Sequence, residues 1–125
     1  MRKILIIDDE KDFCYFMKKN LETADNFKVA VCCNPKEGIK YVRELRPDII
    51  LLDILMPEVS GQQIAAELKN SRDTQNIPVI FLTALITPDE SQMAEHYTSG
   101  IHVMAKPVQM TALTHMINEL VNHND

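Results

Sequence analysis

Residues 48–57 read DIILLDILMP, and this stretch decides the fold of the chain. Four consecutive aliphatic residues at 49–52 stand between two aspartates, with no polar residue alternating among them. A short, unbroken apolar run of this kind is typical of a β-strand that is buried on both faces of a parallel sheet. Asp53 stands directly at the carboxyl end of the predicted strand.

Similar apolar runs recur at near-regular intervals on both sides of this one. With the central run included, they are Lys3–Ile7, Phe27–Cys32, Asp48–Leu52, Pro78–Leu82 and Ile101–Ala105. Between the runs, apolar residues recur at helical spacing, as in the first such segment, which carries Phe13, Phe16, Met17 and Leu21. Helix-start signals precede two of the segments, Asn34-Pro35 and the capping box at 87–90.

This strict alternation of strand and helix predicts an α/β fold of one domain covering residues 1–125. We expect a doubly wound, five-stranded parallel sheet flanked by five helices, of the flavodoxin-like type. A chain of 125 residues suits a single domain with one core.

Composition excludes several classes of function. The net charge is -5 and there is no basic run, which argues against direct nucleic-acid binding. No apolar run is long enough to span a membrane, and the first one meets acidic residues at 8–10 rather than extending into a signal peptide. We therefore expect a cytoplasmic protein. The three cysteines lack metal-type spacing and are predicted to be small buried hydrophobes.

Reactive side chains follow four of the five predicted strands. Asp8-Asp9, Asp53, Thr83-Ala84 and Lys106-Pro107 each stand where a strand ends. In an open α/β sheet the carboxyl ends of the strands form the functional edge, so these groups should meet there. Each one alone would be ordinary, since acids favour helix N-termini and lysines are usually solvated. Their convergence from four strand ends makes a functional site the better interpretation.

Three crowded carboxylates need a cation, and hard oxygen ligands with room for phosphate favour Mg²⁺. A lysine ammonium and a threonine hydroxyl suit the charged oxygens of a transferring phosphoryl group. A carboxylate can itself serve as the nucleophile, which would give an aspartyl phosphate.

The motifs at 6–10, 48–57 with Gly61, 78–84 and Lys106-Pro107 have the spacing of a known family. Across nearly its whole length the chain resembles the receiver domains of two-component response regulators. The resemblance implies the strand order 2-1-3-4-5 and a signalling switch rather than an enzyme, apart from slow self-dephosphorylation. It further implies that Asp53 takes a phosphoryl group from a sensor histidine kinase or a phosphotransfer protein.

The same resemblance assigns a role to each matching position. Asp9, Asp53 and the backbone carbonyl of Leu55 would bind Mg²⁺ directly, and Asp8 would reach it through a water molecule. The remaining members would contact the phosphoryl group: the Thr83 hydroxyl, the Ala84 N–H and the Lys106 ammonium. The Lys106-Pro107 peptide bond is expected to be cis.

The chain departs from the family pattern before its last strand. Val103 stands where many receivers carry Tyr or Phe, and the usual acidic pair after Gly100 is missing from a loop that is one residue shorter. The aromatic switch and the charged dimer face of many transcription regulators are therefore not expected in their usual form.

Two alternatives remain beside this interpretation. A haloacid-dehalogenase-like phosphatase also uses an Asp nucleophile and Mg²⁺, but it would need Asp-x-Asp after the first strand. A degenerate receiver that serves only as an interaction module should have lost an acid, the threonine or the lysine, and all of them are present.

Overall fold

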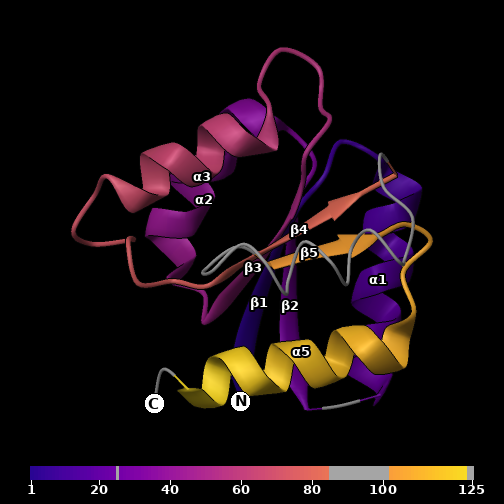
Figure 1. The fold of residues 1–125 in the computed structure, drawn as a ribbon. Helices are drawn as coiled ribbons and strands as arrows, with labels where there is room; N and C mark the ends of the chain where they lie inside the picture. The colour runs from indigo at the N-terminus through magenta and orange to yellow at the C-terminus, as the bar shows by residue number, and fades with distance from the viewer. Residues whose placement is uncertain (25, 85–101, 124–125) are drawn as a thin grey trace.

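The computed structural model describes residues 1–24, 26–84 and 102–123 (Figure 1). Its strands form one five-stranded parallel sheet in the order β2-β1-β3-β4-β5, which confirms the predicted fold class and strand order. The strands are β1 (Arg2–Ile7), β2 (Phe27–Cys32), β3 (Ile49–Asp53), β4 (Val79–Thr83) and β5 (His102–Ala105). The sequence placed each of them within one residue of these bounds.

Helices cover both faces of the sheet. Helices α1 (Lys11–Ala24) and α5 (Met110–His123) lie on one face. Helix α3 (Gly61–Lys69) and helix α2 (Gly38–Leu45), which follows the short 3₁₀ turn η1 (Pro35–Glu37), lie on the other (Figure 1). The helix predicted to open at residue 87 lies outside the described residues.

The sheet divides the core into two apolar clusters, as expected when both faces are covered. Successive residues of β1 point to opposite faces, so Ile4 and Ile6 pack toward α1 and α5 while Leu5 and Ile7 pack toward α2 and α3. All four are at most 1% exposed. This burial on both sides explains why the strands are continuous apolar runs.

The predicted apolar stripe of α1 was wrong at one position. Phe16 is 58% exposed, whereas Cys14, Met17 and Leu21 form the buried face of the helix. The cysteine was therefore a better marker of this face than the aromatic ring. Cys14 and Cys32 are buried and the third, Cys33, is half-buried, with all three thiols free.

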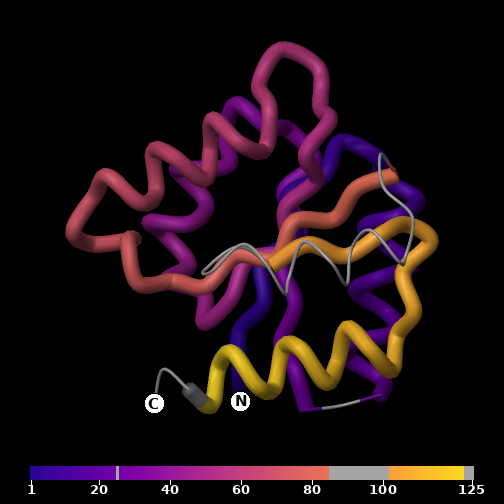
Figure 2. Tube along the Cα trace, in the orientation of Figure 1, coloured from indigo at the N-terminus to yellow at the C-terminus, as the bar shows by residue number. Residues whose placement is uncertain are grey.

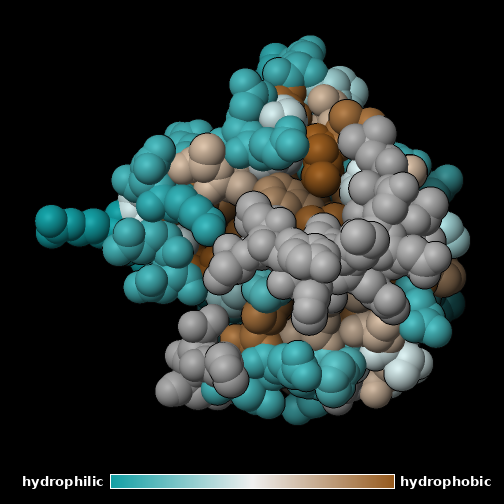
Figure 3. Space-filling view, viewed as in Figure 1, coloured by the Kyte–Doolittle hydropathy of each residue, from teal (hydrophilic) through white to brown (hydrophobic). Residues whose placement is uncertain are grey.

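In the Cα trace of Figure 2, the end of α5 lies beside the start of β1. The amino ends of the strands therefore lie at the edge of the sheet near the end of α5. The outward surfaces over α3 and α5 are largely hydrophilic, with hydrophobic residues showing between them (Figure 3). Among the described residues, no helix has the length and apolar character needed to span a membrane. The carboxyl ends of the strands meet at the edge of the sheet opposite to the one that holds their amino ends.

Candidate functional site

The register of the sheet brings the predicted site residues to one edge. Asp53 is the last residue of β3 and is paired with Leu82, so Thr83 at the end of β4 stands one position further along. Thr83 is paired with Ala105, and its carbonyl accepts a 2.9 Å hydrogen bond from the backbone N–H of Lys106. Asp8 follows β1 directly. Asp8, Asp53 and Thr83 are all at most 5% exposed.

Lys106 is the centre of the site. Its Nζ lies 2.8 Å from Asp8 Oδ2, 3.2 Å from Glu10 Oε1 and 3.7 Å from Asp53 Oδ2. The Lys106 side chain is only 12% exposed and that of Asp8 1%. The Lys106–Pro107 peptide bond is cis, as predicted. The distances from Lys106 show that Asp8, Asp53 and Lys106 meet at this edge, as the sequence predicted.

The electrostatics of the site show an excess of negative charge. Burial, together with the charge of Asp8, raises the pKa of Asp53 to about 6, although Lys106 and a hydrogen bond from the Leu55 N–H act in the opposite direction. Burial also raises the pKa of Asp8. Burial alone would lower the pKa of Lys106, but its hydrogen bond to Asp8 and the acidic charges outweigh this effect and raise it. One lysine does not fully compensate these carboxylates.

The loop that follows Asp53 contacts the Asp53 carboxylate through its backbone. The Leu55 backbone N–H donates to the Asp53 carboxylate, while the Leu55 side chain is 59% exposed. Gly61 opens α3 and donates its N–H to the Ile54 carbonyl at 2.9 Å. A Cβ atom on Gly61 would lie 2.2 Å from the Asp53 carbonyl oxygen. Only glycine allows the start of α3 to approach the Asp53 backbone so closely.

Two of the predicted site residues lie at the margin of this cluster. Asp9 is half-buried and lines a cleft of about 250 Å³ with Asn34, Lys36 and Glu58 among others. Across this cleft Lys36 forms an ion pair with Glu58, whose φ of 69° is left-handed. Ala84 follows β4 and is exposed. The roles predicted from the sequence, Mg²⁺ binding by Asp9 and a contact of the Ala84 N–H with a phosphoryl group, stay predictions.

The structure adds two residues that sequence reasoning missed. Carboxylate oxygens of Asp8, Glu10 and Asp53 lie within 4.8 Å of one another, a spacing that could hold a metal ion. The second is Phe13, whose ring centroid lies 4.2 Å from Lys106 Nζ. The position of Glu10 directly after the aspartate pair was a usable signal. Nothing in the sequence marked Phe13 beyond its place on the apolar stripe.

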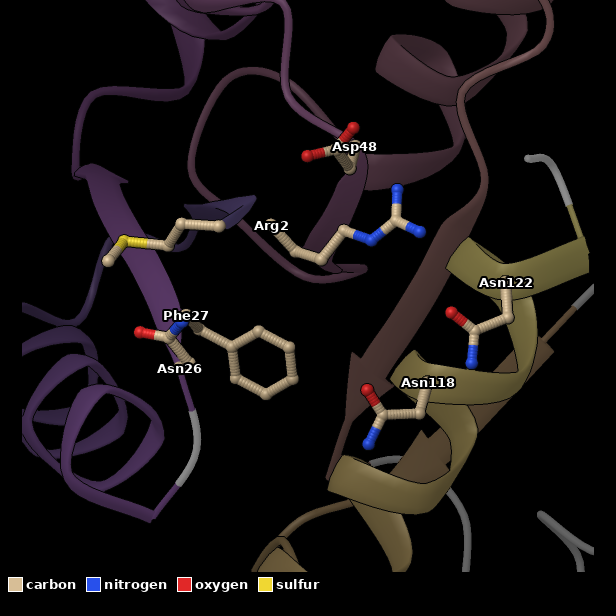
Figure 4. Close-up of a pocket in the computed structure, with 7 residues that line it drawn as sticks. Arg2, Asn26, Phe27, Asp48, Asn118 and Asn122 are labelled. Atoms are coloured by element: carbon tan, nitrogen blue, oxygen red, sulfur yellow. The ribbon is translucent and has the colours of Figure 1, made fainter.

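A hollow of about 440 Å³ lies at the opposite, amino edge of the sheet, far from this chemistry. Arg2 and Phe27 face Asn118 and Asn122 of α5 across it (Figure 4). Its carboxylate, Asp48, already accepts a 2.7 Å hydrogen bond from the Lys3 backbone N–H. Asp48 therefore serves to tie β1 to the start of β3.

The chain is similar to proteins of one family. The model of the response regulator receiver domain matches residues 4–118. A probable cyclic di-GMP phosphodiesterase of Vibrio cholerae is 33% identical over 132 residues, covering 98% of this chain and 29% of that protein. Response regulator Rre1 of Synechocystis is 31% identical, covering 94% of this chain and 51% of that protein. The chain thus spans about half or less of these relatives.

Solved structures agree with this result. The receiver domain of the Francisella response regulator 1452 superimposes with a TM-score of 0.82 at 25% identity, and the match covers 100% of both chains. A response regulator receiver domain protein of Clostridium thermocellum gives a TM-score of 0.82 at 31% identity, covering 99% of this chain and 97% of that one. With the matched family model and the site at the carboxyl edge of the sheet, these findings show that the chain belongs to the response regulator receiver domain family.

Proposed function

We propose that the chain, as one receiver domain over residues 1–125, is a phosphorylation-dependent signalling switch with Asp53 as the phosphoryl acceptor. The observation that carries this proposal is the placement of Asp53. Its carboxylate is buried at the end of β3, beside Asp8 and Glu10 and 3.7 Å from the Lys106 ammonium. A carboxylate held among a cation and further acids is arranged for phosphoryl transfer rather than for packing.

Each residue of the site has a separate role in the proposed phosphoryl transfer. An Asp53 oxygen attacks phosphorus and forms the O–P bond, while the N–P bond of a phosphohistidine donor breaks and its electron pair returns to the imidazole. Lys106 compensates negative charge on the phosphoryl oxygens. The Thr83 hydroxyl and the Ala84 N–H are proposed to donate hydrogen bonds to the same oxygens.

The donor set fits Mg²⁺. The carboxylates of Asp8, Glu10 and Asp53 supply hard oxygen donors, and Asp9 stands at the margin of this cluster. Burial and the charge of Asp8 raise the pKa of Asp53 to about 6 despite the nearby Lys106. We propose that Asp9, Asp53 and the Leu55 carbonyl hold the ion, with Asp8 behind a water molecule. When bound, Mg²⁺ supplies positive charge that offsets the charge of the phosphoryl oxygens.

We further propose a sensor histidine kinase or a phosphotransfer protein as the donor, an effector of unknown kind as the recipient of the signal, and the cytoplasm as the compartment. Neither nucleic acid nor membrane is proposed as a direct partner. Apart from the transfer to Asp53 and slow loss of the phosphoryl group, no enzymatic activity is proposed.

The function is tested with acetyl phosphate as a small phosphoryl donor. Intact mass spectrometry of the parent chain should show one added phosphoryl group with Mg²⁺ and almost none after Mg²⁺ is chelated. An unmodified mass in the presence of donor and Mg²⁺, or equal modification without the metal, would contradict the proposal.

The proposed metal ligands make a separate prediction. Asp9→Ala should weaken Mg²⁺ binding by about tenfold or more and Asp8→Ala by less, since the first removes a direct ligand and the second a water-mediated one. The chain has no Trp, so calorimetry or NMR shifts should serve as the readout. Equal Mg²⁺ affinity in the parent and in Asp9→Ala would contradict this assignment.

The phosphorylated state is predicted to be long-lived for the family. By resemblance, Leu55 and Leu85 flank the path of the attacking water; Leu55 is exposed, and Leu85 lies outside the described residues. Neither side chain can orient a water molecule. The double substitution Leu55→Asn with Leu85→Glu should speed loss of the phosphoryl group by about tenfold, less than a full general base would give. Timing phosphoprotein after donor removal checks this, and a double variant no faster than the parent would refute it.

A further inference from the structure

Lys106 must keep its ammonium at the acceptor although its stem is long and flexible. Two contacts of the ammonium are hydrogen bonds, to Asp8 at 2.8 Å and to Glu10 at 3.2 Å. Asp53 lies 3.7 Å away, beyond hydrogen-bonding distance. Glu10 has a 64% exposed side chain and competes for the same ammonium. Asp8 therefore holds the ammonium on one side, and a further contact is needed to keep the lysine from following Glu10 outward.

The ring of Phe13 lies where such a support would be. Lys106 Nζ stands over the ring at 4.2 Å from its centroid, within the range in which the negative face of an aromatic ring attracts a cation. Phe13 belongs to the first turn of α1, which begins where the Cys14 N–H donates to the Glu10 carbonyl at 3.0 Å. The same side chain packs against the core cluster under α1 and α5. The core therefore fixes the ring that contacts the ammonium.

We propose that Phe13 is a positioning residue that holds the Lys106 ammonium facing Asp53 through a cation–π contact. The ring takes the side of the ammonium that water would otherwise occupy, and so keeps the lysine from turning outward with Glu10. This role deepens the proposed function of the site, on which its effect on phosphorylation rests.

The test uses variants that separate the ring from its bulk. Phe13→Met keeps an apolar side chain of similar volume without a ring, and Phe13→Tyr restores the ring. Phe16→Leu is the matched control, because Phe16 is a second ring on α1 that is 58% exposed. Thermal midpoints of all variants report any loss of packing separately.

The first readout is NMR of the chain with ¹³C-labelled lysine, with the Lys106 signal assigned by its loss in Lys106→Met. Ring current should shift the Lys106 ε-methylene protons upfield in the parent, in Phe13→Tyr and in Phe16→Leu. In Phe13→Met these protons should return toward the position of the exposed lysines. The same position in the parent and in Phe13→Met would overturn the proposal, whatever the thermal midpoints.

The second readout is the rate of labelling by acetyl phosphate with Mg²⁺. Phe13→Met should label about fivefold more slowly than the parent, in line with the strength of a desolvated cation–π contact, and Phe13→Tyr at close to the parental rate. Parental labelling by Phe13→Met, or equal slowing in both Phe13 variants, would overturn the positioning role. Absence of labelling in the parent would instead refute the proposed function, while the NMR result would still decide whether Phe13 holds the lysine.

Discussion

Gly61→Ala is expected to destabilise the fold by about 3 kcal/mol, the upper part of the range for overpacking. The added Cβ would stand 2.2 Å from the Asp53 carbonyl oxygen and 3.0 Å from the Ile54 Cα. Both neighbours are backbone atoms, so no rotamer change can relieve the clash. Either α3 or the end of β3 must move, and a shift of β3 would displace Asp53.

Gly38→Ala is the matched control, since Gly38 also begins a helix. Its Cβ would meet the side chains of Ile7 at 3.3 Å and Ile64 at 3.4 Å, and these can adjust. Alanine also has the higher helix propensity, by about 1 kcal/mol. Urea unfolding followed by circular dichroism should therefore separate the two variants. If Gly61→Ala lowers the free energy of unfolding no more than Gly38→Ala does, the close approach of α3 to the Asp53 backbone is not rigid.

Lys106→Met is expected to cost about 3 kcal/mol at pH 8 without added metal, because it leaves buried carboxylates without their cation. Asp8 and Asp53 have side chains that are 1% and 7% exposed. The methionine keeps most of the apolar packing of the lysine stem. Lys36→Met is the control: Lys36 and Glu58 form an ion pair with both side chains 63% exposed, and its loss should change stability by about 0.5 kcal/mol or less.

The cost of Lys106→Met should depend on pH, with a sign that follows from Asp53. Burial and Asp8 raise the folded-state pKa of Asp53 to about 6, above its ordinary value of 3.8. Protonated Asp53 therefore favours the folded state at low pH, and this stabilisation is lost as the pH rises through about 6. Without Lys106 the folded-state pKa rises further, so the variant loses more stability than the parent between pH 5 and pH 8. A pH-independent difference in the free energy of unfolding would contradict this account.

The sequence predicted the sheet well because its central strands, β1 and β3, have successive buried residues on both faces. Leu51 and Leu52 belong to a run with no polar interruption, so no other element competes for it. Parallel pairing then carried Asp8, Asp53 and Lys106 to one edge, since strand ends on such a sheet meet by topology. The meeting of these three residues could be predicted because their place in the fold depends only on the order of the strands.

The details around Lys106 could not be predicted in the same way. Phe13 and Phe16 are both aromatic residues near the start of α1, but only Phe13 contacts the lysine, while Phe16 is exposed. Which ring turns inward depends on the rotation of the helix about its axis, and packing against the sheet sets that rotation. Glu10 contacts Lys106 because the loop brings it back over Asp8, whose Oδ1 accepts the Glu10 backbone N–H at 2.9 Å. Such loop geometry has no periodic signal in the sequence.

The central claim is that Asp53 is the phosphoryl acceptor, and one measurement tests it most directly. The parent chain and Asp53→Asn are treated side by side with acetyl phosphate and Mg²⁺, and their intact masses are compared. Asparagine keeps the shape of the side chain but lacks the nucleophilic carboxylate, so the parent should gain one phosphoryl group and Asp53→Asn essentially none. Equal uptake of the phosphoryl group by both chains would contradict the account.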